Sequence, residues 1–153
     1  MHVDVIKRHV PQRYPLLLVD RITSIDPGRR ACALKNVTVN EPCYRNVADG
    51  APLRAYAYPP SLLIESMAQT AGILLRTIWS QMENPDEHVI MFGAINDVEF
   101  IADIYPGDTL THEVVAERVI GDTAILSGTT YRDGKPVCRA GQIFVITRGK
   151  EHV

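Results

Sequence analysis

Residues 58–72 read YPPSLLIESMAQTAG and predict the start of a long helix that packs inside the protein. Pro60 suits the first turn of a helix, where its missing N–H group removes no hydrogen bond. Glu65 is the single charged residue of the stretch, and its sequence neighbours are almost all apolar. Because an ionisable side chain is rarely fully buried without a partner, Glu65 is the leading candidate for chemistry.

The rest of the sequence predicts one helix wrapped by a sheet. The long helix is expected over residues 61–82, a short helix over 3–10, and a hairpin of strands over 16–25 and 31–39. Five further strands are expected over 89–95, 97–102, 109–119, 123–131 and 136–147. The short turns between them indicate an antiparallel sheet. We therefore expect residues 1–153 to form a single α+β domain whose sheet curls around the helix.

Composition narrows the classes of function. The 153 residues are 46% hydrophobic and 22% charged, with a formal net charge of −2. No basic cluster longer than two residues occurs, so we expect no nucleic-acid partner. No segment has the apolar length of a signal peptide or a membrane span, so we expect no membrane partner. The three cysteines lack C-x-x-C spacing, which predicts a cytoplasmic protein without disulfides or a metal site.

Four blocks of the sequence resemble the (3R)-hydroxyacyl-ACP dehydratase family, whose members have the hot-dog fold. Residues 13–22 read RYPLLLVDRI, similar to the family's R-Y-P-F-L-L-V-D-R, and residues 36–42 read NVTVNEP. On the predicted helix, residues 65–69 read ESMAQ, similar to E-A-M-A-Q. Residues 100–108 end in Pro-Gly-Asp, similar to F-x-x-P-V-x-P-G-D. The blocks occur in the family's order and span most of the chain.

The resemblance implies an acyl-thioester substrate and a site shared between chains. Family members typically join their sheets edge to edge as dimers, and each site pairs a histidine of one chain with a Glu or Asp of the other. The histidine removes the α-proton, and the carboxyl group helps the β-hydroxyl leave as water. The substrate is carried by acyl carrier protein or CoA, and the resemblance implies neither a cofactor nor a metal.

The sequence departs from the family at two positions. The family's histidine follows the N-E-P block, and counting from that block places Val47 at its position; residues 10–87 contain no histidine at all. The family's Pro-Gly before the helix is Pro59-Pro60 here, so one backbone donor is absent. The N–H groups of Ser61 and Leu62 remain to receive a thioester oxygen.

The resemblance assigns Glu65 as the catalytic residue and Val47, Tyr58, Pro60, Ser61 and Gln69 as substrate-binding residues. Glu65 and Gln69 are four residues apart, so they share one helix face and the amide can orient the carboxyl group. Each has a structural alternative: Glu65 as a carboxylate satisfied by hydrogen bonds, Gln69 as a packing amide, Val47 as a pocket wall and Tyr58 as a loop anchor.

Asp49 and His112 are two other candidate sources of chemistry. Asp49 is a candidate substitute base, but an aspartate beside a glycine usually forms a turn. His112 alternates with Leu110 and Val114 along a predicted strand, which favours a structural role.

Three functions remain open at this point. The first is a dehydratase whose histidine comes from an intact partner subunit in a heterodimer. The second is a hot-dog thioesterase, in which Glu65 activates water or attacks the thioester without needing a histidine. The third is a non-catalytic member of the family, a structural subunit or acyl-thioester binder. For the assembly, the resemblance implies a homodimer or higher oligomer, with the heterodimer as the alternative. The sequence favours the first, because the resemblance covers nearly the whole chain.

Overall fold

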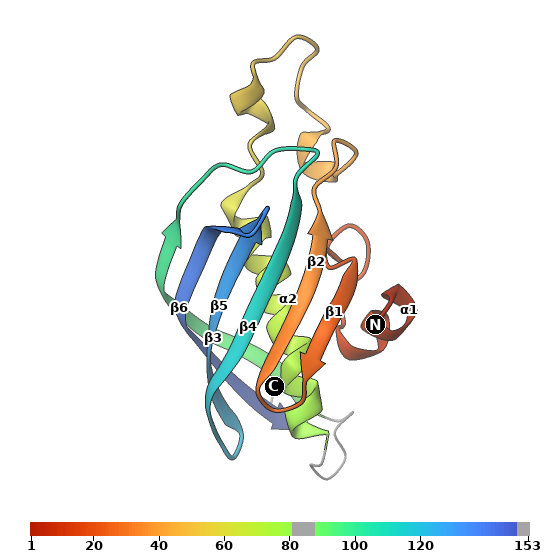
Figure 1. Ribbon diagram of the computed structural model, residues 1–153. Coiled ribbons are helices and arrows are strands. Elements are labelled where there is room, and N and C mark those ends of the chain that lie inside the picture. The colour runs from red at the N-terminus through yellow and green to blue at the C-terminus, as the bar shows by residue number, and fades with distance from the viewer. Residues whose placement is uncertain (81–87, 150–153) are drawn as a thin grey trace.

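The computed structural model describes residues 1–80 and 88–149, which form one curled sheet around one long helix (Figure 1). The helices are α1 (Val3–His9) and α2 (Pro60–Trp79), with two short 3-10 turns at Pro42–Tyr44 and Leu53–Tyr56. The strands are β1 (Arg21–Asp26), β2 (Arg30–Asn36), β3 (His88–Phe100), β4 (Thr109–Ile120), β5 (Thr123–Arg132) and β6 (Lys135–Gly149). This is the α+β architecture that the sequence predicts.

The sheet is antiparallel throughout, with strand order β1-β2-β4-β5-β6-β3. The predicted hairpin of the first two strands is confirmed, since Ile25 pairs with Ala31 across the turn. Strand β3 follows α2 in the chain but pairs along β6, at the far end of the sheet. Among the described residues β3 therefore has one unpaired edge, and an unpaired edge can accept another strand.

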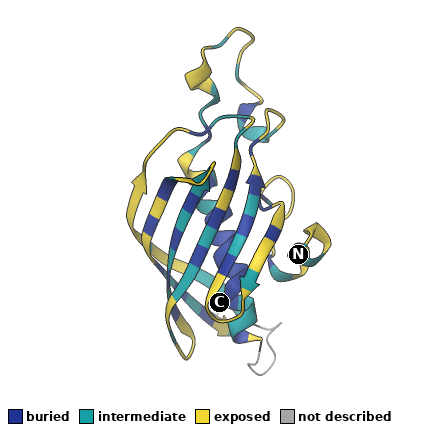
Figure 2. Cartoon of the chain, in the orientation of Figure 1, coloured by how far each residue is buried: buried dark blue, intermediate teal, exposed yellow. Residues whose placement is uncertain are grey.

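Helix α2 supplies the centre of the core, as its apolar sequence predicts. Met67, Ala71, Leu74 and Leu75 are almost completely buried and belong to the cluster that the inner face of the sheet covers. Buried and exposed residues alternate along the central strands, so one face meets the helix and the other meets solvent (Figure 2). Met67 also explains Gly128 on β5, where an added Cβ would clash with the Met67 side chain.

The first strand is shorter than predicted. Residues 16–20 lie outside β1 because several of their backbone groups bond to a side chain instead of a neighbouring strand. Leu18 and Val19 donate their N–H groups to Gln69 Oε1, at 3.0 and 3.4 Å. Leu16 accepts a hydrogen bond of 2.6 Å from Gln69 Nε2 at its carbonyl oxygen. The apolar run therefore packs as an extended segment against α2 without joining the sheet.

The two strands predicted after the helix are one strand, β3. Residues from His88 to Phe100 pair with β6 in sequence, with an irregular register between Phe92 and Ala94. Asp97, which the prediction placed at the start of the second strand, has a positive φ of 55° within β3. Gly141 lies opposite, and an added Cβ there would approach the Asp97 Cβ to 2.9 Å. The boundary predicted between residues 95 and 97 is therefore a backbone distortion inside the single strand β3.

The predicted ends of other elements move by a few residues. Strand β2 stops at Asn36, three residues early, because Val37 donates its N–H to Asp108 in the loop before β4. Helix α2 ends at Trp79 with Ser80 as its cap, and the last two residues of the predicted helix, 81 and 82, lie outside the described residues. Within the described ranges, neither helix has the length and apolar character needed to cross a membrane.

Candidate active site

Glu65 lies on α2 with its carboxylate held by two amide side chains. Gln69 Nε2 donates to Glu65 Oε1 at 2.9 Å, and Gln12 Nε2 donates to the same oxygen at 3.1 Å. Glu65 is half-buried, although its apolar neighbours suggested deeper burial. Both hydrogen bonds end on Oε1, so within the described residues Oε2 is the oxygen left to meet a ligand. The carboxyl group is therefore both accessible and fixed in orientation.

Gln69 connects this carboxylate to the segment before β1. Its side chain is almost fully buried. Its carbonyl oxygen accepts the two backbone N–H groups of Leu18 and Val19, while its amide nitrogen donates to Leu16 and to Glu65. An amide offers two donors and an acceptor oxygen with two lone pairs, and all are used here. The predicted pairing of Glu65 with Gln69 is therefore present, and Gln69 is also a packing amide.

Gln12 is the site residue that sequence reasoning missed. It precedes the Arg13-Tyr14-Pro15 block and is 53 residues from Glu65 in the chain. Its own Oε1 is buried and accepts no hydrogen bond from the described residues. No spacing rule links the two positions. The only sequence signal was its place beside a block that resembles the family.

The substrate-binding candidates lie at different depths. Val47 is half-buried and packs against the main core, in the loop between β2 and α2 that extends beyond the sheet (Figure 1). Pro60 is the first residue of α2, and Ser61 beside it is exposed. The Leu62 N–H donates to the Pro59 carbonyl at 3.0 Å. Of the two expected backbone donors, only that of Ser61 remains uncommitted among the described residues.

Tyr58 belongs to a buried polar cluster under the same loop. Lys35 Nζ lies 2.8 Å from Glu41 Oε1 and 5.7 Å from the centre of the Tyr58 ring. The side chains of Lys35 and Glu41 are only 6% and 12% exposed. The hydroxyls of Tyr44 and Tyr58 are buried and have no hydrogen bond of good geometry among the described residues. The cluster anchors the N-E-P block to strand β2.

Burial controls the protonation of this cluster. Burial raises the pKa of Tyr58, and the neighbouring Glu41 carboxylate raises it further. Burial likewise raises the pKa of Tyr44 and of Cys43. All three groups therefore stay protonated at neutral pH. A thiol with a raised pKa is a poor nucleophile, so Cys43 behaves as a small apolar residue.

His112 fits the structural role that the sequence favours. It is fully buried on β4, with Nε2 2.8 Å from Ser66 Oγ and Nδ1 2.8 Å from Thr130 Oγ1. Ser66 donates its hydroxyl proton to the Leu63 carbonyl, so this pattern fits a neutral imidazole that donates through Nε2. Burial lowers the pKa of His112 to about 3. A substrate cannot reach this imidazole. Asp49, the candidate substitute base, is exposed in the loop between β2 and α2.

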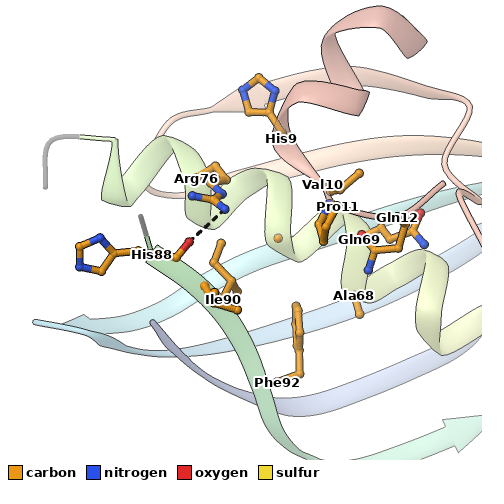
Figure 3. A pocket seen from close by; sticks show the side chains of 12 residues that line it. His9, Val10, Pro11, Gln12, Ala68, Gln69, Arg76, His88, Ile90 and Phe92 are labelled. Atoms are coloured by element: carbon orange, nitrogen blue, oxygen red, sulfur yellow. Dashed lines mark hydrogen bonds between the residues drawn. The ribbon is translucent and has the colours of Figure 1, made fainter. Parts of the chain in front are cut away.

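A cavity of about 270 Å³ lies beside the two amide side chains that hold the Glu65 carboxylate (Figure 3). It lies between α2, strand β3 and the residues that follow α1. Gln12 and Gln69, the two donors to Glu65, line it together with apolar residues such as Ala68 and Phe92. Three basic residues also line it: His9, Arg76 and His88. The site thus combines an oriented carboxyl group with an adjoining, mostly apolar space. That combination suits chemistry on the polar end of a ligand that also has an apolar chain.

The fold defines the class of protein. The chain superposes on the dehydratase heterocomplex ApeI:P from Xenorhabdus doucetiae with a TM-score of 0.73 and 14% identity, covering 95% of this chain and 92% of that one. It superposes on a hot-dog-like protein from Thermanaerovibrio acidaminovorans with a TM-score of 0.60 and 19% identity, over 80% and 83% of the chains. The architecture is therefore the hot-dog fold.

Sequence comparison then identifies the family. Residues 10–141 match the model of the FabA-like domain. The 3-hydroxyacyl-[acyl-carrier-protein] dehydratase FabZ of Haemophilus ducreyi is 36% identical over 140 residues, which cover 92% of this chain and 87% of the relative. The chain belongs to the FabA-like domain family and is a 3-hydroxyacyl-ACP dehydratase-like protein. The resemblance drawn from four sequence blocks is confirmed.

Proposed function

We propose that this chain supplies the carboxyl half of a 3-hydroxyacyl thioester dehydratase site and takes the base from a histidine-bearing hot-dog partner. The observation that carries the proposal is the carboxylate of Glu65, oriented by Gln12 and Gln69, in a chain with no histidine from residue 10 to residue 87. The amide donors hold one carboxyl oxygen, and the second faces the substrate.

In this scheme the dehydration is divided between two chains. The partner's histidine removes the α-proton, a carbon–carbon double bond forms, and the bond from the β-carbon to its hydroxyl oxygen breaks. Glu65 donates a proton to that hydroxyl, which leaves as water. The N–H of Ser61, at the start of α2, is the donor proposed for the thioester oxygen as negative charge builds there. Val47, Tyr58 and Pro60 are proposed to shape the entry beside this donor.

The unpaired edge of β3 supports a partner at this end of the sheet. Phe92, Val98 and Phe100 on β3 are large apolar residues with more than a third of their surface exposed. An exposed apolar edge strand is otherwise an aggregation hazard, which a second sheet would remove. A heterocomplex is the form of the Xenorhabdus doucetiae dehydratase structure whose fold this chain shares. The carrier of the acyl group is proposed to be acyl carrier protein, as in the name of the curated relative.

The test is hydration of a 2-enoyl thioester, followed by the loss of its ultraviolet absorbance. Three samples are compared: the pure chain, the chain with a histidine-bearing dehydratase encoded beside it, and the same mixture with Glu65→Gln. The proposal expects no turnover from the pure chain, and turnover in the mixture that falls when Glu65 is replaced. Turnover in the mixture that is unchanged by Glu65→Gln contradicts a shared site and favours a non-catalytic subunit.

The same samples examine the thioesterase alternative. Free thiol would be released from saturated acyl thioesters by the pure chain if Glu65 served hydrolysis. A thiol-reactive dye follows this release. Thiol release by the pure chain that is lost in Glu65→Gln would show that the protein is a thioesterase and would contradict the proposed dehydration.

A further inference from the structure

Gly72 is a glycine in the middle of helix α2 that packing does not explain. Apart from proline, glycine is the weakest helix former, so its place in a central helix calls for a reason. The usual reason is a close neighbour, as for Gly128, where an added Cβ would strike Met67. At Gly72 an added Cβ would meet no atom within 4 Å. Alanine would therefore fit the described structure and strengthen the helix.

The space beside Gly72 is the cavity next to Glu65. Gly72 lines this cavity, one turn of helix beyond Ala68 and one turn before Arg76. Ile90 and Phe92 of β3 line it as well (Figure 3). The absent side chain at position 72 thus leaves open volume in the wall of a mostly apolar cavity. At the other end, Gln12 and Gln69 join the cavity to the Glu65 carboxyl group.

We propose that Gly72 is a specificity-determining residue, which keeps this cavity open for the part of an unbranched acyl chain beyond the reacting carbons. The inference rests on the proposed function and adds the substrate class, a medium-length linear acyl thioester. The cavity volume of about 270 Å³ lies just below the usual range for drug-sized ligands. A slender chain therefore fits this cavity better than a large ring system.

The length of the cavity along α2 sets a scale for the chain. The seven steps along the helix from Gln69 to Arg76 rise by roughly 10 Å at ~1.5 Å each. An extended zigzag of about eight carbons has a similar length, with C–C bonds of roughly 1.5 Å. Gly72 lies near the middle of this path. A side chain at position 72 should therefore obstruct an eight-carbon acyl group and spare a four-carbon one.

The experiment compares Gly72→Ala with the unchanged protein, each in the active mixture with its partner. The rates of hydration are measured for four-carbon and eight-carbon 2-enoyl thioesters. We expect kcat/KM for the longer substrate to fall by roughly tenfold, the usual effect of one methylene in an apolar pocket, with little change for the shorter one. The melting temperature should rise by roughly 2–4 °C, because alanine is the better helix former.

The opposite signs of these two effects separate specificity from folding. A glycine needed for packing would give a less stable protein and lower rates for both substrates. Thr77→Ala is the matched control, since Thr77 lies on the same helix but does not line the cavity. It should leave the ratio of the two rates unchanged. Gly72→Val, with a larger side chain, should lower the rate for the eight-carbon substrate further.

Three outcomes overturn the inference, and each is distinct from failure of the proposed function. An unchanged rate ratio in a stabilised Gly72→Ala protein shows that the acyl chain lies elsewhere. Equal losses for both substrates contradict a role in chain length. A change in dimer affinity by sedimentation, with an unchanged ratio, shows that a second chain fills the cavity. If the proposed function fails, the unchanged protein with its partner shows no hydration at all. Calorimetry with saturated four-carbon and eight-carbon acyl-pantetheine thioesters then measures whether the cavity binds the longer chain and whether Gly72→Ala weakens that binding.

Discussion

The carboxyl side of the candidate site and the loop between β2 and α2 are both held in place, but by different means. Glu65 is oriented by neutral amides and remains half-exposed, as a group that meets a ligand must be. The loop is anchored by the ion pair of Lys35 and Glu41, which is nearly buried and faces the core. One region presents a carboxylate to solvent, whereas the other carries Val47, which counting from the N-E-P block places at the position of the family's histidine.

The interactions that hold the loop in place are therefore distinct from any residue that could react there. A buried ion pair is weak evidence for net stability, but it fixes the geometry of the residues that carry it. Here the Lys35–Glu41 ion pair fixes the start of the loop. Position 47 of that loop is a valine, which cannot serve as a base. Substitutions can test whether the loop holds a histidine at position 47 in a catalytic geometry, and whether the Glu65 side of the site depends on Gln12 and Gln69.

Val47→His should have the largest effect, because it puts a base into the supported loop. A positioned general base contributes roughly 10²–10⁴-fold to proton transfer. We expect the pure Val47→His chain to hydrate a 2-enoyl thioester at least about 100-fold faster than the unchanged chain. Ultraviolet absorbance measures the rate. Val39→His, at an exposed position early in the same loop, is the control and should remain inactive.

Should both histidine variants remain equally inactive while folded, the loop would not be a framework for the base. Activity equal in both would show that any added histidine suffices.

Lys35→Met should destabilise the protein by about 3–5 kcal/mol, because it leaves the Glu41 carboxylate buried without its cation. The free energy of unfolding is measured by urea denaturation. Arg29→Met is the matched control, since it breaks the exposed pair of Arg29 with Asp26, which is worth at most about 1 kcal/mol. Equal losses in the two variants would contradict the anchoring role of the buried pair.

Gln69→Leu should cost about 2–4 kcal/mol of unfolding free energy, because the N–H groups of Leu18 and Val19 lose their acceptor inside the protein. Gln12→Ala removes only one donor to Glu65 and should cost about 1 kcal/mol. Chemical denaturation compares the two. A larger loss for Gln12 than for Gln69 would reverse the order of support on the carboxyl side.

His112 should give the protein an acid-dependent stability. Its folded pKa of about 3 lies below the unfolded value of 6.5. Between these values the unfolded chain binds a proton that the folded chain does not, so the free energy of unfolding falls as the pH falls from 6.5 towards 3. The slope is up to about 1.4 kcal/mol per pH unit. Its stabilising contribution is complete above pH 6.5.

The measurement is urea denaturation from pH 4 to pH 7, for the unchanged protein and for His112→Gln. The variant should lose the part of the slope that belongs to one proton. An identical slope in both proteins would mean that His112 is charged in the folded state.

The sequence alone predicted the elements that depend on local pattern. The apolar helix around Glu65, the first hairpin and the β4–β5–β6 meander follow from periodicity and turn residues, and the structure confirms them. Local pattern failed where a distant group replaced the expected neighbour. Leu16, Leu18 and Val19 lie in a segment that resembles a strand, but their backbone groups bond to Gln69. Asp97 was expected to begin a new strand but lies within β3.

The candidate site divides in the same way. The sequence determined that a carboxylate and an amide share one face of a central helix, because a spacing of four residues fixes that geometry. It also determined that residues 10–87, which include the N-E-P block and the loop after it, contain no histidine. Only the tertiary structure decided that Gln12 joins Glu65, that Lys35 is buried, and that Gly72 borders a cavity. These depend on contacts between distant segments, and such contacts depend on how whole elements pack rather than on the residues beside them.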